Sequence, residues 1–324
     1  MPYISSMLEV SNAGRIVFPA IGRTKGDVVS YYERVAERVL PHVAGRPLSV
    51  RRFPKGLAAP GFFQKNVPPH YPESIGRFEV PRRQASSKKH ARSKGAEPKD
   101  VTVYPLVREA GHLAYLANQG AIELHVPTAR AEDLYRPDRI VFDLDPPPGE
   151  LALVRRAAQI VRDALGELGL ESVPVATGSK GYHVVCAIRP TVGVDVLFIT
   201  IQKLATLLAS KHPDVLTIAF RVTLRGKRVF VDWLRNTPNA TVVAPYSLRA
   251  LPRATIATPL AWSEIETTAP DAFAIDDLER LLDRSDTLAE LARSPSDAER
   301  FVSEVDAAFD ASGLVLEPFD RFRS

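Results

Sequence analysis

The stretch Val141-Phe142-Asp143-Leu144-Asp145-Pro146-Pro147-Pro148 is the centre of the fold that this sequence predicts. A short apolar run bounded by turn residues predicts a buried strand, here over residues 139–145. The three prolines that follow cannot extend a central ladder, so the strand must end before them. Side chains two apart on a strand share a face, which places Asp143 and Asp145 side by side at its carboxyl end.

This pair of acids suggests a cation site. At ~4–6 Å and an effective dielectric of ~20, two carboxylates repel by roughly 3–4 kcal/mol, so one must hold a proton or a cation must neutralise both. No basic residue lies in the run 141–149, which makes a hard divalent metal the simpler answer. Acids that face solvent or cap the next loop are the alternative. A second apolar run, Arg228-Val229-Phe230-Val231-Asp232-Trp233, predicts another strand with a third acid.

Periodicity along the chain predicts a mixed α/β (α+β) fold. Apolar residues at helical spacing predict helices over 24–43, 111–118, 151–168 and 194–212, and residues 263–324 also have a helical pattern. Further strands are predicted over 101–104, 122–125, 173–175, 182–188 and 228–234. Strands and helices alternate between 139 and 234, which indicates α/β layers. The length of 324 residues allows one large domain or two lobes.

Composition is ordinary for a soluble globular protein, with 45% hydrophobic and 25% charged residues. The net charge of +4 does not by itself indicate nucleic acid, but eight Lys/Arg against two Glu lie between Arg77 and Lys99. Within this stretch, residues 85–99 predict a basic loop that either clamps a phosphate backbone or is a solvated excursion. The single cysteine, Cys186, allows no disulfide within the chain and suits a reducing interior. With no signal-like or membrane-spanning apolar run, we expect a cytoplasmic protein.

The segment Gly178-Ser179-Lys180-Gly181-Tyr182-His183 is a candidate anion site. It lacks the spacing of a Walker A loop. Its two glycines nevertheless let the backbone approach an anion closely, near a hydroxyl, an ammonium and an imidazole. In an extended conformation Ser179 and His183 share one face, and Lys180 points away unless the loop twists. A hydrogen-bonded histidine at a strand end is the alternative interpretation of His183.

The segment Phe62-Phe63-Gln64-Lys65 is a candidate base-stacking site. Adjacent phenylalanines on a strand cannot both face one core, so one ring should be exposed. An exposed ring beside a lysine offers stacking for an unpaired base and a charge for its phosphate. A half-buried aromatic pair is the alternative.

Taken together, these segments resemble the polymerase domain of bacterial ligase D, in the archaeo-eukaryotic primase superfamily. The matching stretches keep the family order over roughly residues 10–265: Arg15-Ile16-Val17-Phe18-Pro19, Thr24-Lys25-Gly26-Asp27, Phe62-Phe63-Gln64-Lys65-Asn66, Leu116-Ala117-Asn118-Gln119-Gly120, Ile122-Glu123-Leu124-His125, Phe142-Asp143-Leu144-Asp145-Pro146, Gly178-Ser179-Lys180-Gly181-Tyr182-His183, Val231-Asp232-Trp233-Leu234-Arg235-Asn236 and Val243-Ala244-Pro245-Tyr246-Ser247. Each is weak alone, and the ordered set is specific.

The resemblance implies a role for each candidate residue. It implies two divalent ions, Mn²⁺ or Mg²⁺, held by Asp143, Asp145 and Asp232. It implies triphosphate contacts from Ser179, Lys180, His183 and Arg249, with Arg225 as a weaker candidate. It implies a grip on a DNA 5′-phosphate by Arg15, Lys25 and Lys65, and template stacking on Phe62 and Phe63. Arg15 stands where lysine is common in the family, which keeps the charge and changes the geometry.

The resemblance also implies an architecture and partners. We expect one primase-polymerase domain over 1–324, with an N-terminal lobe over about 1–135, a catalytic portion resembling an RNA-recognition-motif sheet over about 136–262, a helical segment over 263–324 and a cleft between the lobes. The implied function is template-directed gap filling or end extension in DNA repair, with ribonucleotides accepted besides deoxynucleotides. The implied partners are gapped or broken DNA with a 5′-phosphate, NTP or dNTP, Ku and a separate ATP-dependent DNA ligase. We expect no membrane partner, and a cytoplasmic localisation in association with the nucleoid.

Neither a ligase Lys-x-Asp-Gly segment nor a phosphoesterase block occurs in the sequence, so we expect a stand-alone polymerase. Two other functions remain open from the sequence. One is a non-catalytic DNA-end binding module that recruits a ligase and keeps the acids as vestiges. The other is a phosphohydrolase that uses the same metals.

Overall fold

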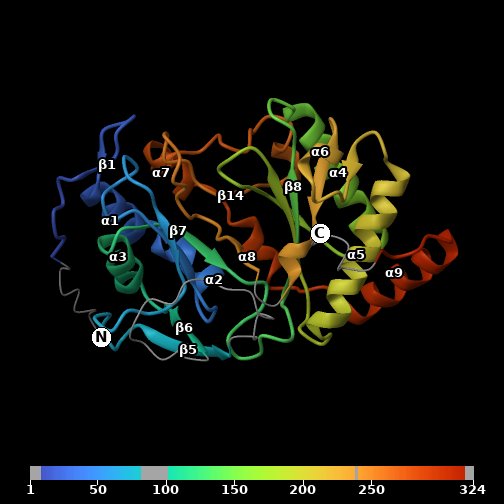
Figure 1. The fold of residues 1–324 in the computed structure, drawn as a ribbon, viewed down its shortest axis with the longest axis horizontal. Coiled ribbons are helices and arrows are strands. Elements are labelled where there is room, and N and C mark those ends of the chain that lie inside the picture. Colours follow the sequence, from blue (N-terminus) through green and yellow to red (C-terminus); the bar gives the residue numbers. More distant parts are fainter. Residues whose placement is uncertain (1–8, 82–100, 238–239, 318–324) are drawn as a thin grey trace.

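The computed structural model describes residues 9–81, 101–237 and 240–317. The basic stretch predicted at 85–99 therefore lies outside the described residues. Within the described ranges, helices flank two main β-sheets, one of six strands and one of four (Figure 1). Two separate strand pairs complete the sheet structure of these ranges: β1 (Ile16–Phe18) with β2 (Arg23–Thr24), and β5 (Gly76–Pro81) with β6 (Val101–Leu106). This confirms the mixed helix-and-sheet fold that the sequence predicts.

The six-stranded sheet contains both acid-bearing strands. Its order is β11-β12-β8-β10-β9-β14. The bounds are β8 Arg139–Asp145, β9 Val173–Ala176, β10 Tyr182–Ala187, β11 Leu216–Thr217, β12 Val229–Asp232 and β14 Thr258–Pro259. All neighbours are antiparallel except β11 and β12. Strand β8 therefore lies between the other acid-bearing strand, β12, and the strand β10 that follows the glycine-rich segment.

Two long helices support this sheet. Helix α4 (Leu151–Glu167) packs on β8, β10 and β12 through the buried stripe Val154, Ala158, Val161 and Leu165, which is the stripe expected from helical spacing. Helix α5 (Val194–Lys211) packs against β11 and against α9 (Ala298–Ser312) at the far end of the molecule (Figure 1). No helix in the described ranges is both long enough and apolar enough to cross a bilayer.

The four-stranded sheet has the order β13-β7-β3-β4. Its strands are β3 (Ser49–Arg52), β4 (Phe62–Gln64), β7 (Ala121–Val126) and β13 (Val242–Val243). Strand β13 follows the acid-bearing strand β12 in the chain, yet it pairs with β7. The chain therefore passes from one sheet to the other soon after Asp232, and this crossing brings the two sheets together at the candidate site.

One predicted helix is wrong. The sequence predicts a single helix over 24–43, but the structure has α1 (Lys25–Arg34) and α2 (Ala36–Val43). The turn tightens at Val35, where the amide of Arg38 donates to the Val35 carbonyl three residues back (2.9 Å), and Pro41 inside α2 has no amide to donate. The predicted start is confirmed, because Thr24 and Asp27 cap each other's amides at 3.2 and 2.7 Å.

The second acid-bearing strand is shorter than predicted. It ends at Asp232 instead of reaching Leu234, and residues Trp233–Asn236 form the 3₁₀ helix η1. The Asp232 carboxylate caps this turn by accepting a hydrogen bond from the Leu234 amide (3.0 Å). The turn matters for the site because it folds Arg235 back toward the acids.

The remaining helices in the part of the chain that the structure describes are α3 (Ala110–Asn118) beside α1, and α6 (Val222–Arg225), η2 (Trp262–Glu264), η3 (Ile275–Asp277), α7 (Leu278–Leu282) and α8 (Thr287–Leu291). Ion pairs from Arg23 to Asp276 and from Arg34 to Glu279 tie the C-terminal segment to α1 and the strand before it. One buried apolar cluster extends through both main sheets. The division into an N-terminal lobe, a catalytic portion and a helical segment stays a prediction.

Candidate active site

Three aspartates meet on one face of the six-stranded sheet. Strands β8 and β12 are antiparallel, and Asp232 lies directly opposite Asp143 in their register. Asp145 is two residues along β8 and therefore points to the same face as Asp143. Residues distant in sequence are thus brought together by one strand pair.

Burial makes this acidic group electrostatically unfavourable. Burial, reinforced by Asp145, raises the pKa of Asp143 to about 6. Burial, opposed by Arg235 and reinforced by Asp143, raises the pKa of Asp232 to about 6. A buried like-charge group of this kind favours either protons or a cation.

The guanidinium of Arg235 partly neutralises the acidic group. Nε of Arg235 lies 3.1 Å from an oxygen of Asp143 and 3.1 Å from an oxygen of Asp232. Burial alone would lower the pKa of Arg235, but the charges of Asp143 and Asp232 raise it. The sequence analysis did not assign a role to Arg235. Its position three residues after Asp232 could have indicated one, because one turn of a 3₁₀ helix brings such a side chain back beside the acid.

The donor set fits a hard divalent cation, because all three side chains offer carboxylate oxygens. As the side chains stand, no three His, Cys, Asp or Glu residues within the described ranges are grouped to hold a metal ion. Arg235 lies between Asp143 and Asp232. A cation at these oxygens would therefore compete with this guanidinium.

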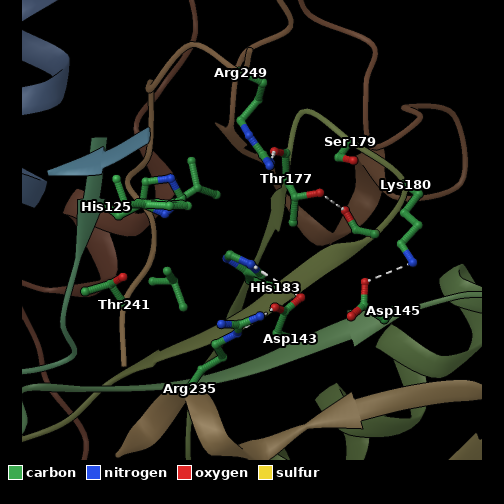
Figure 2. Close-up of a pocket in the computed structure, with 14 residues that line it drawn as sticks. His125, Asp143, Asp145, Thr177, Ser179, Lys180, His183, Arg235, Thr241 and Arg249 are labelled. Carbon is green, nitrogen blue, oxygen red and sulfur yellow. Dashed lines mark hydrogen bonds and ion pairs between the residues drawn. The ribbon is translucent and has the colours of Figure 1, made fainter. Parts of the chain in front are cut away.

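The glycine-rich segment forms the turn between β9 and β10 above the acids (Figure 2). Thr177 closes the turn by donating through Oγ1 to the Gly181 carbonyl (2.7 Å). A Cβ on Gly181 would collide with the Leu144 carbonyl oxygen, so only glycine fits there. Gly178 has a positive φ of 68°, which also favours glycine.

Two side chains of this segment reach the acids. Nε2 of His183 lies 3.5 Å from Asp143, and Nζ of Lys180 lies 3.3 Å from Asp145 (Figure 2). Lys180 would point away only from an extended segment, and the structure has the turn that brings it to the acids instead. Burial, together with Arg235 and Arg249, lowers the pKa of His183 to about 3, so its imidazole is neutral. Ser179 lies on the same turn at the cavity wall.

These residues line a cavity of about 300 Å³ between the two sheets. The four-stranded side contributes His125 on β7 and Phe63 on β4. The chain after the crossing contributes Thr241 and Arg249 (Figure 2). Arg249 also donates to the Thr177 carbonyl and so joins this part of the chain to the turn. Sequence reasoning named Arg249 but did not assign roles to His125 or Thr241, although His125 stood in a matched stretch.

Arg225 does not line this cavity. Its guanidinium donates to the carbonyls of Ala219 and Phe220, both at 3.0 Å, and lies 3.8 Å from the ring centroid of Phe230. In this conformation the side chain stabilises its own loop.

A second cavity, of about 190 Å³, is basic. Arg15 and Lys25 line it together, joined by Arg52, which sequence reasoning missed. The Lys25 ammonium donates to the carbonyl and the hydroxyl of Ser11 (2.6 and 2.8 Å), and burial with the nearby Arg15 lowers its pKa. Lys65 is exposed and does not line this cavity.

Both predicted stacking residues are exposed: Phe62 by 49% and Phe63 by 58%. The sequence predicts only one exposed ring. The guanidinium of Arg52 lies 5.7 Å from the Phe62 ring centroid, and that of Arg51 lies 5.8 Å from the Phe63 ring centroid. As consecutive residues of β4 the two rings point to opposite faces of the sheet, Phe62 beside Arg52 and Phe63 beside Arg51. Phe63 and Arg51 thus form an exposed aromatic and cationic platform on β3 and β4, beside the acidic cavity that Phe63 also lines.

Comparison with known proteins agrees with these features. Residues 24–288 match the model of the LigD primase-polymerase domain. The chain is 34% identical over 301 residues to the multifunctional non-homologous end joining DNA repair protein LigD of Mycobacterium tuberculosis, a match that covers 90% of this chain and 38% of that protein. It is 27% identical over 295 residues to the bifunctional non-homologous end joining protein LigD of Bacillus subtilis, covering 90% and 45%. The chain thus spans less than half the length of these relatives.

A solved structure is similar over nearly its whole length. The polymerase domain from Mycobacterium tuberculosis ligase D in complex with DNA superposes with a TM-score of 0.76 at 33% identity, covering 88% of this chain and 98% of that one. The similarity therefore extends over most of the fold described above.

Proposed function

Because the chain belongs to the LigD primase-polymerase domain family, a family of DNA-directed nucleotidyltransferases, we propose that it is a template-directed polymerase that fills gaps or extends ends in DNA repair by non-homologous end joining. The observation that supports this most strongly is the strand register that sets Asp232 opposite Asp143, with Asp145 on the same face. These acids lie beside a cavity with hydroxyl and cationic side chains, as a nucleoside triphosphate requires.

The proposed reaction joins the primer 3′-oxygen to the α-phosphorus of the nucleotide and releases pyrophosphate. Asp143, Asp145 and Asp232 would hold two Mn²⁺ or Mg²⁺ ions, which when bound supply activation of the 3′-hydroxyl and charge neutralisation on pyrophosphate. Lys180 and Arg249 would bind the triphosphate as cations, and Ser179 as a hydroxyl donor. His183 would donate one neutral hydrogen bond, because burial keeps it uncharged.

We propose DNA as the macromolecular ligand, since the similar polymerase domain was solved with DNA. Phe62 and Phe63 would stack on unpaired template bases. Arg15 and Lys25, with Arg52, would bind the 5′-phosphate beyond a gap, and Lys65 would contact the backbone outside the basic cavity. Acceptance of ribonucleotides, and cooperation with Ku and a separate ATP-dependent DNA ligase, belong to the same proposal.

A gapped-duplex extension assay tests this function. The protein is given Mn²⁺, Mg²⁺ or EDTA, each nucleotide type, and a gap with or without a downstream 5′-phosphate. The proposal expects metal-dependent incorporation with pyrophosphate release, stimulated by the 5′-phosphate. Tight 5′-phosphate-dependent binding without incorporation would indicate an end-binding module, and release of inorganic phosphate would indicate a phosphohydrolase.

A further inference from the structure

A buried carboxylate lies behind one wall of the acidic cavity without lining it. Glu123 on β7 is only 2% exposed. Its Oε2 lies 2.9 Å from Nε2 of His125, and its Oε1 accepts a hydrogen bond from the Ala250 amide at 2.9 Å. Arg51 lies 3.4 Å and Arg249 3.6 Å from the same Oε1. Four groups from three segments of the chain thus converge on one side chain.

Glu123 is ionised at any working pH. Burial alone would raise its pKa, but the hydrogen bond from His125, the charge of Arg249 and the Ala250 amide hold it at about 2. An ionised carboxylate can only accept hydrogen bonds. Nε2 of His125 must therefore carry a proton, which leaves Nδ1 as the ring nitrogen available to a ligand.

The partners of Glu123 belong to different walls of the site. His125 and Arg249 line the acidic cavity directly. Arg51 belongs to the stacking platform, where its guanidinium lies 5.8 Å from the Phe63 ring centroid. The rings of Phe63 and His125 pack edge to face, with their centroids 5.2 Å apart. One buried charge therefore contacts groups on both the nucleotide side and the template side of the proposed site.

We propose that Glu123 is a positioning residue of this site, which orients His125 and Arg249 toward the incoming nucleotide. Through Arg51 it also couples them to the stacking platform at Phe63. The inference rests on the proposed polymerase function and deepens it. Glu123 itself touches neither substrate nor metal, so its loss should weaken nucleotide binding more than the chemical step.

The variant Glu123→Gln tests this role with little change in volume. Its amide oxygen can still accept from the Ala250 amide, but its NH₂ group then faces Nε2 of His125. The imidazole proton must move to Nδ1, and the charge that orients Arg249 is lost. We expect the KM for the nucleotide to rise about tenfold while kcat changes less than about threefold. An unchanged KM would overturn the proposal.

Asp286→Asn is the matched control. Asp286 is 7% exposed, lies 2.8 Å from Nε2 of His42 and accepts from the Ala289 amide at 3.0 Å. It thus repeats the buried histidine, carboxylate and amide arrangement without lining the cavity. We expect it to lower the melting temperature about as much as Glu123→Gln, with an unchanged KM. An equal rise in KM in both variants would show a general structural effect and overturn the positioning role.

Nitrogen-15 NMR of the histidines tests the same geometry in the unaltered protein, even if Glu123→Gln does not fold. The His125 signals, assigned by their loss in His125→Asn, should be those of the Nε2–H tautomer. The Nδ1–H tautomer would overturn the proposal. An unaltered protein that incorporates no nucleotide would contradict the proposed function itself, whereas an active protein with an insensitive Glu123→Gln variant would contradict only the positioning role.

Discussion

The acidic and basic cavities of this protein both hold partly buried like charges, which are negative in the acidic cavity and positive in the basic cavity. In the acidic cavity, burial raises the pKa of Asp143, and beside it that of Asp232, to about 6. In the basic cavity, burial and Arg15 lower the pKa of Lys25. Each cavity therefore holds charges that are unfavourable without a ligand of opposite charge.

This contrast indicates which ligand each cavity suits. The acidic cavity has Arg235 as partial compensation and suits cations that carry a triphosphate. The basic cavity compensates Lys25 with the neutral Ser11 oxygens and suits a phosphate. Four experiments test the contrast, and the first should change activity most.

The acidic cavity should give this largest change in activity. Asp232→Asn keeps an oxygen for the Leu234 amide, so the turn should survive. It removes one of the carboxylates proposed to hold the ions, and such ions stabilise the charge of the transition state by several kcal/mol. We expect incorporation to fall roughly 10³-fold in the gap-extension assay. Asp163→Asn, on the exposed side of α4, is the control, and activity of Asp232→Asn close to that of the control would contradict the metal role.

The second prediction concerns pH. Asp143 has a folded-state pKa of about 6 against an ordinary value of 3.8, so the folded protein binds more protons than the unfolded chain between these values. This acid therefore lowers the free energy of unfolding as pH rises through that window, by roughly 3 kcal/mol. The free energy of unfolding of Asp143→Asn, relative to that of the wild type, should therefore increase by this amount as the pH rises from about 4 to about 7. Urea unfolding in the presence of EDTA measures this difference. A pH-independent difference would contradict the burial argument.

The third prediction concerns the basic cavity. Lys25→Met keeps the aliphatic volume and removes the ammonium. A lost charge-assisted hydrogen bond should reduce the stimulation by a downstream 5′-phosphate about tenfold, with little change on gaps that lack the phosphate. Lys203→Met on α5, which removes an ion pair with Asp306, is the control. Equal losses with and without the phosphate would contradict the separation of the two cavities.

The smallest effect should come from the platform beside the acidic cavity. Phe63→Ala removes one exposed ring, and base stacking on an aromatic side chain contributes ~1–3 kcal/mol. For an exposed ring we expect the lower end of this range, a rise of about fivefold in the Kd for gapped DNA, measured by fluorescence anisotropy. Tyr135→Ala removes a ring that is also exposed but lines neither cavity. A similar loss in both variants would exclude specific stacking.

Much of the site could be predicted from local sequence. The positions of β8 and α4 followed from apolar periodicity and from the prolines that end the strand. Periodicity did not locate the break at Val35 or the end of β12, because both depend on tight turns. It also left the direction of Lys180 open, because an extended segment and a turn place alternate side chains differently.

The order of amino acids was enough to show which residues bear charge and on which face of a strand they would lie, because side-chain alternation is a local property of the backbone. It did not show that Arg235 lies between two of the acids or that Glu123 joins His125 to Arg249. These contacts arise in the folded chain, which crosses from one sheet to the other after Asp232. Pairings between distant segments are set by register and packing, which no short stretch of sequence contains.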